Sequence, residues 1–391
     1  MQNKEIVLKY GCNPHQSRAR AFAKTGELPM TVLNGQPGYI NLLDAVNSWQ
    51  LVKELRTALN MPAAASFKHV SPAGAAVGLP LNDTLKKVYF VDNMELSPVA
   101  IAYARARGAD RMSSFGDWAA LSDTVDVSTA KLLKREVSDG IIAPGYEPEA
   151  LAILKNKKKG NYIVIEINPD YTPTELEQRE IYGITFEQNR NKYVITAEIL
   201  RNVVTKKKTM PQTAVQDLLV ATIALKYTQS NSVCLAYDGQ VIGAGAGQQS
   251  RIHCTRLACS KADKWFLRQH PKVLSLQFKK ELKRPEKINA IEQYLEEDLT
   301  EAERKDWESR FETIPDLLTK DEQYEWLDKL DNVSLSSDAF FPFRDNIDRA
   351  SRSGVKYIVQ PGGSIKDEDV IKAANDYGMT MAISGVRLFH H

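Results

Sequence analysis

A lysine and a histidine stand side by side at Lys68 and His69, directly after an apolar run that is typical of a short strand. Ser71 and Pro72 follow, and these residue types are favoured at the cap and first position of a helix. The order predicts a strand end beside a helix start, where open α/β sheets bind ligands. A neutral imidazole, favoured by the positive helix end, can accept a proton there, and the ammonium can stabilise an oxyanion.

The residues alone leave a second interpretation of this dipeptide open. Lys68 can equally be a solvated lysine, and His69 a hydrogen-bonded structural histidine. A similar choice applies to Gly243, Gly245 and Gly247, which fit either a backbone that approaches a ligand or close packing of a strand on a helix. The aromatic segment Ser336–Asn346 can stack on a planar ring or pack in a core.

Composition excludes several classes of protein. The chain has 391 residues, 43% hydrophobic and 26% charged, with a formal net charge of +2. Such values are ordinary for a globular protein and give no general attraction to nucleic acid or membranes. The lysine runs Lys157–Lys159 and Lys206–Lys208 are therefore expected to be solvated. Four cysteines without a Cys-x-x-Cys spacing predict reduced, buried thiols and no structural zinc. The first ten residues lack a signal-peptide core, so we expect a cytoplasmic protein.

Periodicity predicts the elements that must position these residues. The expected strands are Ile6–Tyr10, Met30–Leu33, Ala63–Phe67, Gly140–Ala143, Tyr162–Ile167, Tyr193–Thr196, Val233–Tyr237, Gln240–Ile242, Lys356–Gln360 and Thr380–Ile383. The expected helices are Asn41–Leu59, Pro148–Asn156, Thr213–Tyr227, Ile288–Tyr294, Glu301–Phe311, Lys320–Leu330 and Lys366–Tyr377. Alternating strands and helices indicate an α/β layered fold.

The distribution of strands predicts two α/β domains and one insertion. The first domain is expected over residues 1–180, and the second over residues 181–268 and 332–391. Residues 269–331 between the two parts have high charge and no strand signal, which is typical of a helical insertion.

Seven segments together resemble one family. They are Tyr10–Gln16, Ser66–Gly78, Tyr103–Asp117, Arg135–Tyr146, Lys226–Leu257, Ser337–Asn346 and Arg387–His391. The family is the bifunctional purine-biosynthesis enzyme that joins 5-aminoimidazole-4-carboxamide ribonucleotide (AICAR) formyltransferase to inosine monophosphate cyclohydrolase, and the likeness is to its transformylase half. The resemblance implies a cytidine-deaminase-like α/β fold used twice, with the helical insertion in the second copy.

The resemblance also implies a reaction and the residues that perform it. A formyl group would pass from 10-formyltetrahydrofolate to the 5-amino group of AICAR, giving formyl-AICAR and tetrahydrofolate. His69 would accept the proton of the amine, and Lys68 would stabilise the transferring formyl group. The residues implied to contact AICAR are Lys9, Tyr10, His69, Gly116, Asp139, Asn231, Phe340 and Arg387. Those implied to line the folate side are Arg251, Ile252, Asp345, Ser364 and Ile365.

A potassium ion and a second copy of the chain are implied in the same way. Such domains are homodimers with active sites shared between subunits. The implied potassium ligands are oxygens of Leu225, Thr228, Ser230, Ser232, Asp338, Leu388 and His390. Hard oxygen ligands suit an alkali cation. On this reading the C-terminal tail is part of the packed structure.

The sequence departs from the family pattern in two ways. Lys9 precedes Tyr10 where the family usually has arginine, and a lysine holds a phosphate as a point charge, without a bidentate fork. The cyclohydrolase half that normally precedes these motifs is missing from the sequence, so we expect no ring closure by this chain.

Three rival functions stay open at this point. A hydrolytic nucleoside deaminase would suit the implied fold, but the zinc signature of that class is absent from the sequence. A non-catalytic AICAR-binding regulator would keep the pocket without turnover. Formate and ATP could replace the folate, although the sequence has no phosphate loop.

Overall fold

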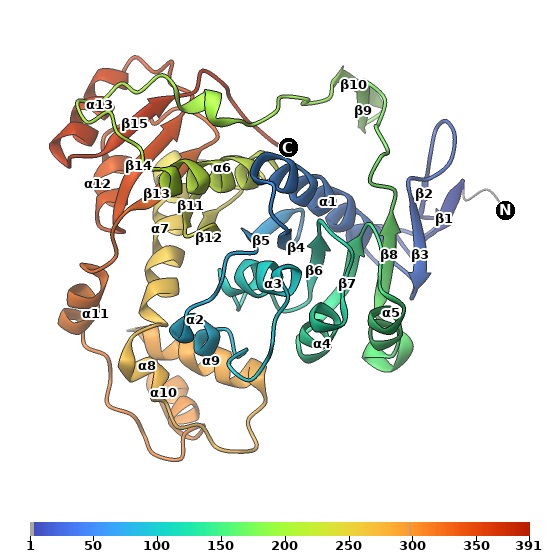
Figure 1. Cartoon of the computed structure of the whole chain (residues 1–391), viewed down its shortest axis with the longest axis horizontal. Helices are drawn as coiled ribbons and strands as arrows, with labels where there is room; N and C mark the ends of the chain where they lie inside the picture. The colour runs from blue at the N-terminus through green and yellow to red at the C-terminus, as the bar shows by residue number, and fades with distance from the viewer. Residues whose placement is uncertain (1–3, 297) are drawn as a thin grey trace.

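One large mixed sheet forms the centre of the molecule (Figure 1). The computed structural model describes residues 4–296 and 298–391. The sheet has eleven strands in the order β15-β14-β13-β11-β12-β5-β4-β6-β7-β8-β3. Their bounds are β3 Met30–Asn34, β4 Ala63–Lys68, β5 Ser71–Val77, β6 Asp117–Leu121, β7 Ser138–Ala143, β8 Ile163–Ile167, β11 Val233–Tyr237, β12 Gln240–Gly245, β13 Val333–Ser337, β14 Val355–Gln360 and β15 Thr380–Ile383. The predicted α/β class is confirmed.

The same strand pattern occurs twice within this sheet. In the first half, β4 and β5 form a hairpin, β6 runs antiparallel to β4, and β7 and β8 continue parallel to β6. In the second half, β11 and β12 form the hairpin, β13 runs antiparallel to β11, and β14 and β15 continue parallel. The first half lies to the right in Figure 1 and the second to the left. The two halves therefore repeat the same strand topology, although the sequence shows no clear repeat.

Helices cover both faces of the sheet. One apolar core lies under α1 (Tyr39–Leu59) and α6 (Gln212–Lys226). The other core lies under α2 Asp83–Val88, α3 Pro98–Gly108, α4 Val127–Arg135, α5 Pro148–Lys155, α7 Arg251–Leu267, α12 Asp345–Ser351 and α13 Asp367–Asp376. Consecutive residues of a strand point alternately into one core and the other. The molecule therefore has three layers, with the sheet between two layers of helices.

Two glycines let the central helices approach the hairpins closely. A Cβ on Gly74 of β5 would lie 2.1 Å from the carbonyl oxygen of Ala106 in α3. A Cβ on Gly243 of β12 would lie 2.2 Å from the carbonyl oxygen of Ala258 in α7. Any larger side chain at either position would force the helix away from the sheet. Close packing, the second of the two interpretations of the Gly243 loop, is therefore confirmed for Gly243.

The two halves meet where β5 lies against β12. The strands share one register pair, Gln240 with Ala76. Arg105 of α3 is buried behind this junction and donates to the carbonyl oxygens of Leu79 and Asp238 and to the side-chain oxygen of Gln240. It also forms an ion pair of 2.8 Å with Asp238. One guanidinium thus joins strands and loops of both halves.

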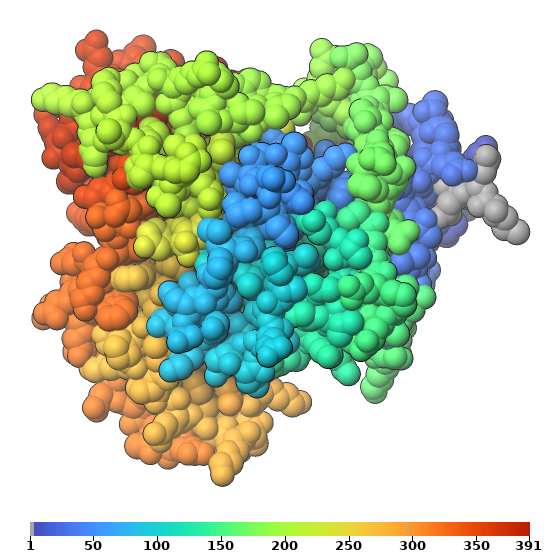
Figure 2. Space-filling view, viewed as in Figure 1, coloured from blue at the N-terminus to red at the C-terminus, as the bar shows by residue number. Residues whose placement is uncertain are grey.

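A helical segment separates α7 from β13. It contains α8 (Pro271–Leu274), α9 (Arg284–Leu295), α10 (Glu301–Glu308) and α11 (Lys320–Leu327). It has its own apolar cluster, centred on Trp307, Tyr294 and Phe311. Figure 2 shows this segment, coloured gold to orange, against the light-blue part of the first half. The exact domain boundaries given above stay a prediction.

Two predicted elements are wrong. Ser71 and Pro72 do not begin a helix, because Ser71–Val77 is strand β5, paired along its length with β4. The small residues Ala73–Ala76 can be covered on both faces, and burial in the sheet outweighs the local helix-start signal. The expected strand Tyr193–Thr196 is an irregular segment without strand pairing. The expected strand Ile6–Tyr10 is shorter, since β1 covers Glu5–Val7 and pairs with β2 (Arg20–Phe22) outside the main sheet.

An exposed two-stranded arm lies between the halves of the sheet in sequence. It consists of β9 (Leu176–Ile181) and β10 (Ile184–Asn189), which pair only with each other among the described residues.

In the described parts of the chain, no helix is long and apolar enough to cross a membrane. Cys234, Cys254 and Cys259 are buried free thiols, as predicted, but Cys12 is exposed.

A buried carboxyl on α6 makes the stability of this fold depend on pH. Asp217 accepts hydrogen bonds from the backbone of Asp238 and Gly239, at 3.1 and 2.6 Å, in the turn of the second hairpin. Burial raises its pKa to about 7. The folded chain thus holds this proton more tightly than the unfolded chain, where the pKa is about 4. The resulting stabilisation is complete below about pH 4 and is lost as the pH rises to 7.

Asp217→Asn should remove this dependence, because an amide keeps an acceptor oxygen and has no proton to lose. Between pH 5 and 8, the free energy of unfolding of the wild type should fall relative to that of the variant by about 3 kcal/mol, measured by urea denaturation. Asp83→Asn, at an exposed carboxyl, is the control. Parallel pH profiles for the wild type and Asp217→Asn would show that the Asp217 carboxyl does not titrate in this range.

Candidate active site

Lys68 and His69 lie at the tip of the first hairpin, in a turn that the neighbouring elements hold firmly. His69 and Val70 both have positive φ, 52° and 59°. Such a turn suits a two-residue hairpin loop but is unfavourable for a β-branched residue such as Val70. The backbone N–H of Val70 donates to Asp44 of α1 at 2.7 Å. The ammonium of Lys68 donates to the carbonyl oxygen of Phe115 at 2.5 Å.

These contacts give the two side chains different surroundings. Lys68 is half-buried, whereas His69 is exposed and open to a ligand. Burial raises the pKa of Asp44, backbone hydrogen bonds from Val70 and His69 lower it, and the charges of His69 and Asp139 also act on it. The side chains of Asp44, His69 and Asp139 therefore lie close enough for their charges to interact. No helix begins at Ser71, so the helix-end argument for a neutral His69 does not apply.

Gly116 and Asp139 lie beside this turn. The Lys68 ammonium is bound by the carbonyl group that precedes Gly116, and a Cβ on Gly116 would be 3.6 Å from a carboxylate oxygen of Asp139. Gly116 has a φ of 74°, which favours glycine. Asp139 forms an exposed ion pair of 2.6 Å with Lys158. The structure thus brings four of the predicted residues, Lys68, His69, Gly116 and Asp139, into one cluster.

A second cluster surrounds the buried carboxylate of Asp338. It accepts from the hydroxyl of Ser230 at 2.7 Å and from the backbone of Ser232 at 2.9 Å, and it pairs with Arg251 at 2.5 Å. Arg251 is itself buried and donates also to the side-chain oxygen of Asn231 at 2.9 Å. In this arrangement the Arg251 guanidinium donates three hydrogen bonds to protein oxygens, those of Ser232, Asn231 and Asp338.

The C-terminal tail is fixed to the same cluster. Leu388 is buried, and its N–H donates to the carbonyl oxygen of Asp338 at 2.9 Å. The N–H of His390 donates to the hydroxyl of Ser230, and Ser230 in turn donates its N–H to the carbonyl oxygen of His390. Arg387 and Phe389 alternate with these residues, are exposed, and lie with the Arg387 guanidinium 4.7 Å from the ring.

Both clusters lie on one edge of the sheet. The pairing places the end of β4 beside the start of β6, and the start of β6 beside that of β7. Because β5 and β12 are antiparallel, the start of β5 lies on the same side as the end of β12 and the start of β11. A hydrogen bond of 3.1 Å from the N–H of Gln229 to the hydroxyl of Ser71 links the two clusters.

The remaining predicted residues are more scattered. Phe340 is exposed just beyond Asp338, and Ile252 is half-exposed on the first turn of α7. Ser364 and the fully exposed Ile365 follow β14, and Asp345 begins α12. These five positions, with Arg387, lie around the second cluster or beyond the ends of its neighbouring strands.

Lys9 and Tyr10 lie apart from these groups. They follow β1, the strand that Figure 1 shows near β3 at the outer side of the first half and far from β13–β15. In the part of the chain that the structure describes, no hydrogen bond or ion pair joins either residue to the two clusters.

A buried ion network behind Lys68 was not foreseen from the sequence. Arg107 of α3 pairs with Asp117 at 2.7 Å and with Glu136 at 3.1 Å, and all three side chains are almost fully buried. Asp117 also accepts from the hydroxyl of Ser66 at 2.6 Å. Lys157, expected to be solvated, is buried and donates to the carbonyl oxygen of Glu136. Burial lowers the pKa of Lys157 to about 8. These charges fix the strand ends that carry Lys68 and Gly116.

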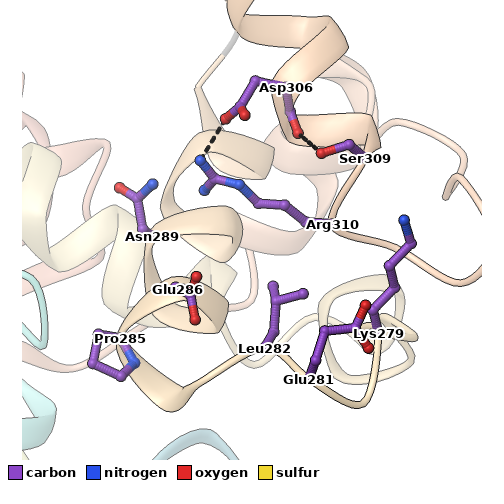
Figure 3. Close-up of a pocket in the computed structure, with 9 residues that line it drawn as sticks. All are labelled: Lys279, Glu281, Leu282, Pro285, Glu286, Asn289, Asp306, Ser309 and Arg310. Carbon is purple, nitrogen blue, oxygen red and sulfur yellow. Dashed lines mark hydrogen bonds and ion pairs between the residues drawn. The ribbon is translucent and has the colours of Figure 1, made fainter.

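A large hollow elsewhere on the molecule contains none of the predicted residues. It lies between α9 and α10, has a volume of about 500 Å³, and is lined by residues such as Lys279, Glu286 and Arg310 (Figure 3). Arg310 is already paired with Asp306 at 2.6 Å. In residues 4–296 and 298–391, no group of three His, Cys, Asp or Glu side chains is arranged to hold a metal ion.

The geometry defines an α/β protein with a duplicated sheet and a polar site on one sheet edge, equipped with a lysine, an exposed histidine and several cationic groups. The model of the AICARFT/IMPCHase bienzyme family matches residues 1–261. The chain belongs to this family.

Two longer relatives agree with this assignment. The bifunctional purine biosynthesis protein PurH of Ruegeria sp. (strain TM1040) is 30% identical over 389 residues, 98% of this chain and 59% of the relative. The protein of the same name from Xanthomonas campestris pv. campestris (strain 8004) is 31% identical over 397 aligned residues, 99% of this chain and 58% of the relative. The chain thus spans somewhat more than half the length of these relatives.

Asp338→Asn should destabilise the fold strongly, because it leaves the buried Arg251 charge without a counter-ion. The free energy of unfolding should fall by about 3–5 kcal/mol in chemical denaturation. Asp331→Asn, at an exposed carboxylate that is 3.7 Å from Lys356, is the matched control and should cost about 1 kcal/mol or less. Equal effects of the two substitutions would mean that Asp338 does not organise the second cluster.

Proposed function

We propose that this chain transfers a formyl group from 10-formyltetrahydrofolate to the 5-amino group of AICAR, as a step of purine biosynthesis. The family match and the names of the relatives support a role in that pathway. The choice of formyl transfer rests on one observation, the tip of the first hairpin, whose turn is held by hydrogen bonds to Asp44 and Phe115. It presents an exposed His69 next in sequence to Lys68, whose ammonium donates to the carbonyl oxygen of Phe115.

The reaction requires a proton acceptor and a group that stabilises negative charge, and His69 and Lys68 can supply them. The AICAR amine is conjugated with its ring and must lose a proton as it attacks the formyl carbon, which His69 can accept. The tetrahedral intermediate carries an oxyanion, which the Lys68 ammonium can stabilise. The C–N bond to the folate then breaks, the folate nitrogen takes a proton, and formyl-AICAR and tetrahydrofolate leave.

The two substrates would lie along the sheet edge. AICAR would lie against Gly116, Asp139, Asn231, Phe340 and Arg387, and its phosphate would meet a cation such as Arg387. The folate would lie towards Ile252, Asp345, Ser364 and Ile365. Arg251 would contribute indirectly, because its guanidinium holds Asn231 and Asp338 in place. The repeated strand pattern supports the proposed name of the fold, a cytidine-deaminase-like domain used twice.

A second copy of the chain would complete the site. The arm formed by β9 and β10 exposes Leu176, Ile181, Ile184 and Phe186, each with 47–58% of its surface accessible. An isolated hairpin with this much exposed apolar surface is stabilised by a partner. We therefore propose a homodimer with shared active sites, which would also give Lys9 and Tyr10 a route to the nucleotide of the other subunit.

The oxygen groups around Asp338 fit a potassium ion. The hydroxyl of Ser232 is buried and has no hydrogen-bond partner among the described residues. Ser230 and Leu388 are hydrogen-bonded to Asp338, and His390 is hydrogen-bonded to Ser230. Thr228 donates its N–H to the carbonyl oxygen of Leu225 and its hydroxyl to that of Ala224, at the end of α6. Oxygen donors of this kind suit an alkali cation. A bound ion would hold the C-terminal tail beside the Asn231 loop.

Substitutions at the hairpin tip test the proposed reaction. His69→Ala should lower kcat for AICAR formylation by about 10²–10⁴-fold, because the proton acceptor is lost. Lys68→Met should lower kcat by about 10²–10³-fold while the dissociation constant for AICAR changes little. Turnover is followed by the absorbance of the folate product, and AICAR binding by calorimetry.

Lys53→Met, an exposed lysine of α1, provides the matched control and should keep full activity. Wild-type turnover in His69→Ala would rule out the proposed proton acceptor. Equal losses of turnover and AICAR affinity in Lys68→Met would assign that lysine to binding. A wild-type chain that binds AICAR and forms no product would be the non-catalytic regulator.

A further inference from the structure

A second cavity lies between the first half of the sheet and the helical segment. It has a volume of about 380 Å³. One wall comes from α2 and the chain that follows it, the other from α8, α9 and the loop between them. Figure 1 shows α2 beside α8 and α9, and Figure 2 shows the two segments in contact at the surface. A volume of this size is in the range of small-molecule sites.

The wall of this cavity is mostly apolar. Large side chains from both segments face it: Val88, Phe90, Val273, Leu274, Leu276, Phe278, Ile288 and Ile291. Leu274 is 38% exposed, a high value for a side chain of this type next to a hollow. The cavity therefore offers a surface on which the apolar body of a ligand gains free energy by leaving water.

The charged residues of the wall are strongly unbalanced. Four are cations, Lys87, Arg111, Arg268 and Lys287, and one is an anion, Asp92. Arg268 is paired with Glu292 at 2.6 Å. In the described chain, neither Lys87 nor Lys287 has a carboxylate within ion-pair distance, and the Lys287 ammonium lies 5.8 Å from the Phe278 ring. The cavity thus carries unneutralised positive charge over an apolar wall.

Arg111 is the most informative of these residues. Its side chain is only 4% exposed, and its Nε has no hydrogen-bond partner among the described residues. Its terminal nitrogens reach Glu136 and the carbonyl oxygen of Tyr89, and its guanidinium lies 5.2 Å from the Phe90 ring. Glu136 also pairs with Arg107 and Arg284, so one carboxylate serves three guanidinium groups. A buried donor left unpaired costs free energy that an acceptor would recover.

We propose that this cavity binds an amphipathic organic anion, a carboxylate or sulfonate on an aromatic or branched apolar body. The apolar body would lie between Phe90 and Phe278 and along Leu274 and Ile291. The acidic group would lie towards Lys87 and Arg111. None of the residues assigned to formyl transfer lines this cavity, so the proposal stands independently of the proposed function.

Arg111 itself is a poor position for a test, because it belongs to the buried network. The ion pairs run from Arg111 to Glu136, Arg107 and Asp117, and removal of one member would disturb the fold. Lys87 is exposed, and Ile291 is half-exposed, so both tolerate substitution better.

The test uses the fluorescent anion 8-anilinonaphthalene-1-sulfonate with the full chain. We expect saturable binding to the wild type. Lys87→Gln should weaken this binding about tenfold, because it removes one charge-assisted contact. Ile291→Trp, which fills the cavity, should abolish it. Lys86→Gln, at the neighbouring lysine that pairs with Asp83 outside the cavity, is the matched control and should bind as the wild type does.

The uncharged relative N-phenyl-1-naphthylamine separates this cavity from general apolar surface such as the β9–β10 arm. It should bind at least tenfold more weakly than the sulfonate. Unchanged sulfonate affinity in both Lys87→Gln and Ile291→Trp would overturn the proposal, as would equal affinity for the sulfonate and the uncharged amine. Thermal unfolding of each variant confirms that the loss of binding is local.

Discussion

The pairing of the two hairpins is the constraint on which the rest of the structure depends. β5 and β12 share a single register pair, and Arg105 strengthens their junction by binding the loops of both halves. Because Gly74 and Gly243 have no side chain, α3 packs closely on the first hairpin and α7 on the second, both on the same face of the sheet. Only this antiparallel arrangement places the tip of the first hairpin on the same sheet edge as the open end of the second. The bond from Gln229 to Ser71 then joins the two clusters.

Buried charge performs a similar role on both sides of that edge. In the first half, Arg107 with Asp117 and Glu136 fixes the starts of β6 and β7. In the second half, Asp338 with Arg251 fixes the start of β11 and the C-terminal tail. Such pairs add little net stability, because desolvation offsets their attraction, but they penalise any other arrangement of the loops. The exposed groups at the edge are thereby held in place before a substrate arrives.

Part of this account could be predicted from the sequence and part could not. Periodicity located α1, α6 and the two strands of the second hairpin, because this signal is local. Ser71 and Pro72 misled the prediction, since a helix-start pattern cannot reveal that β4 and β12 will flank the segment. Arg251 and Asp338 are distant in sequence, so their contact follows from the fold alone. The resemblance supplied the site residues, and the structure brings most of them to one edge.

We propose that the groups at this sheet edge catalyse formyl transfer to AICAR. The most direct measurement is product analysis by mass spectrometry, after the purified chain is incubated with AICAR and 10-formyltetrahydrofolate in a potassium buffer. We expect that AICAR gains one formyl group and that tetrahydrofolate appears in equal amount. AICAR that is bound by the chain but recovered unchanged, with the folate intact, would contradict it.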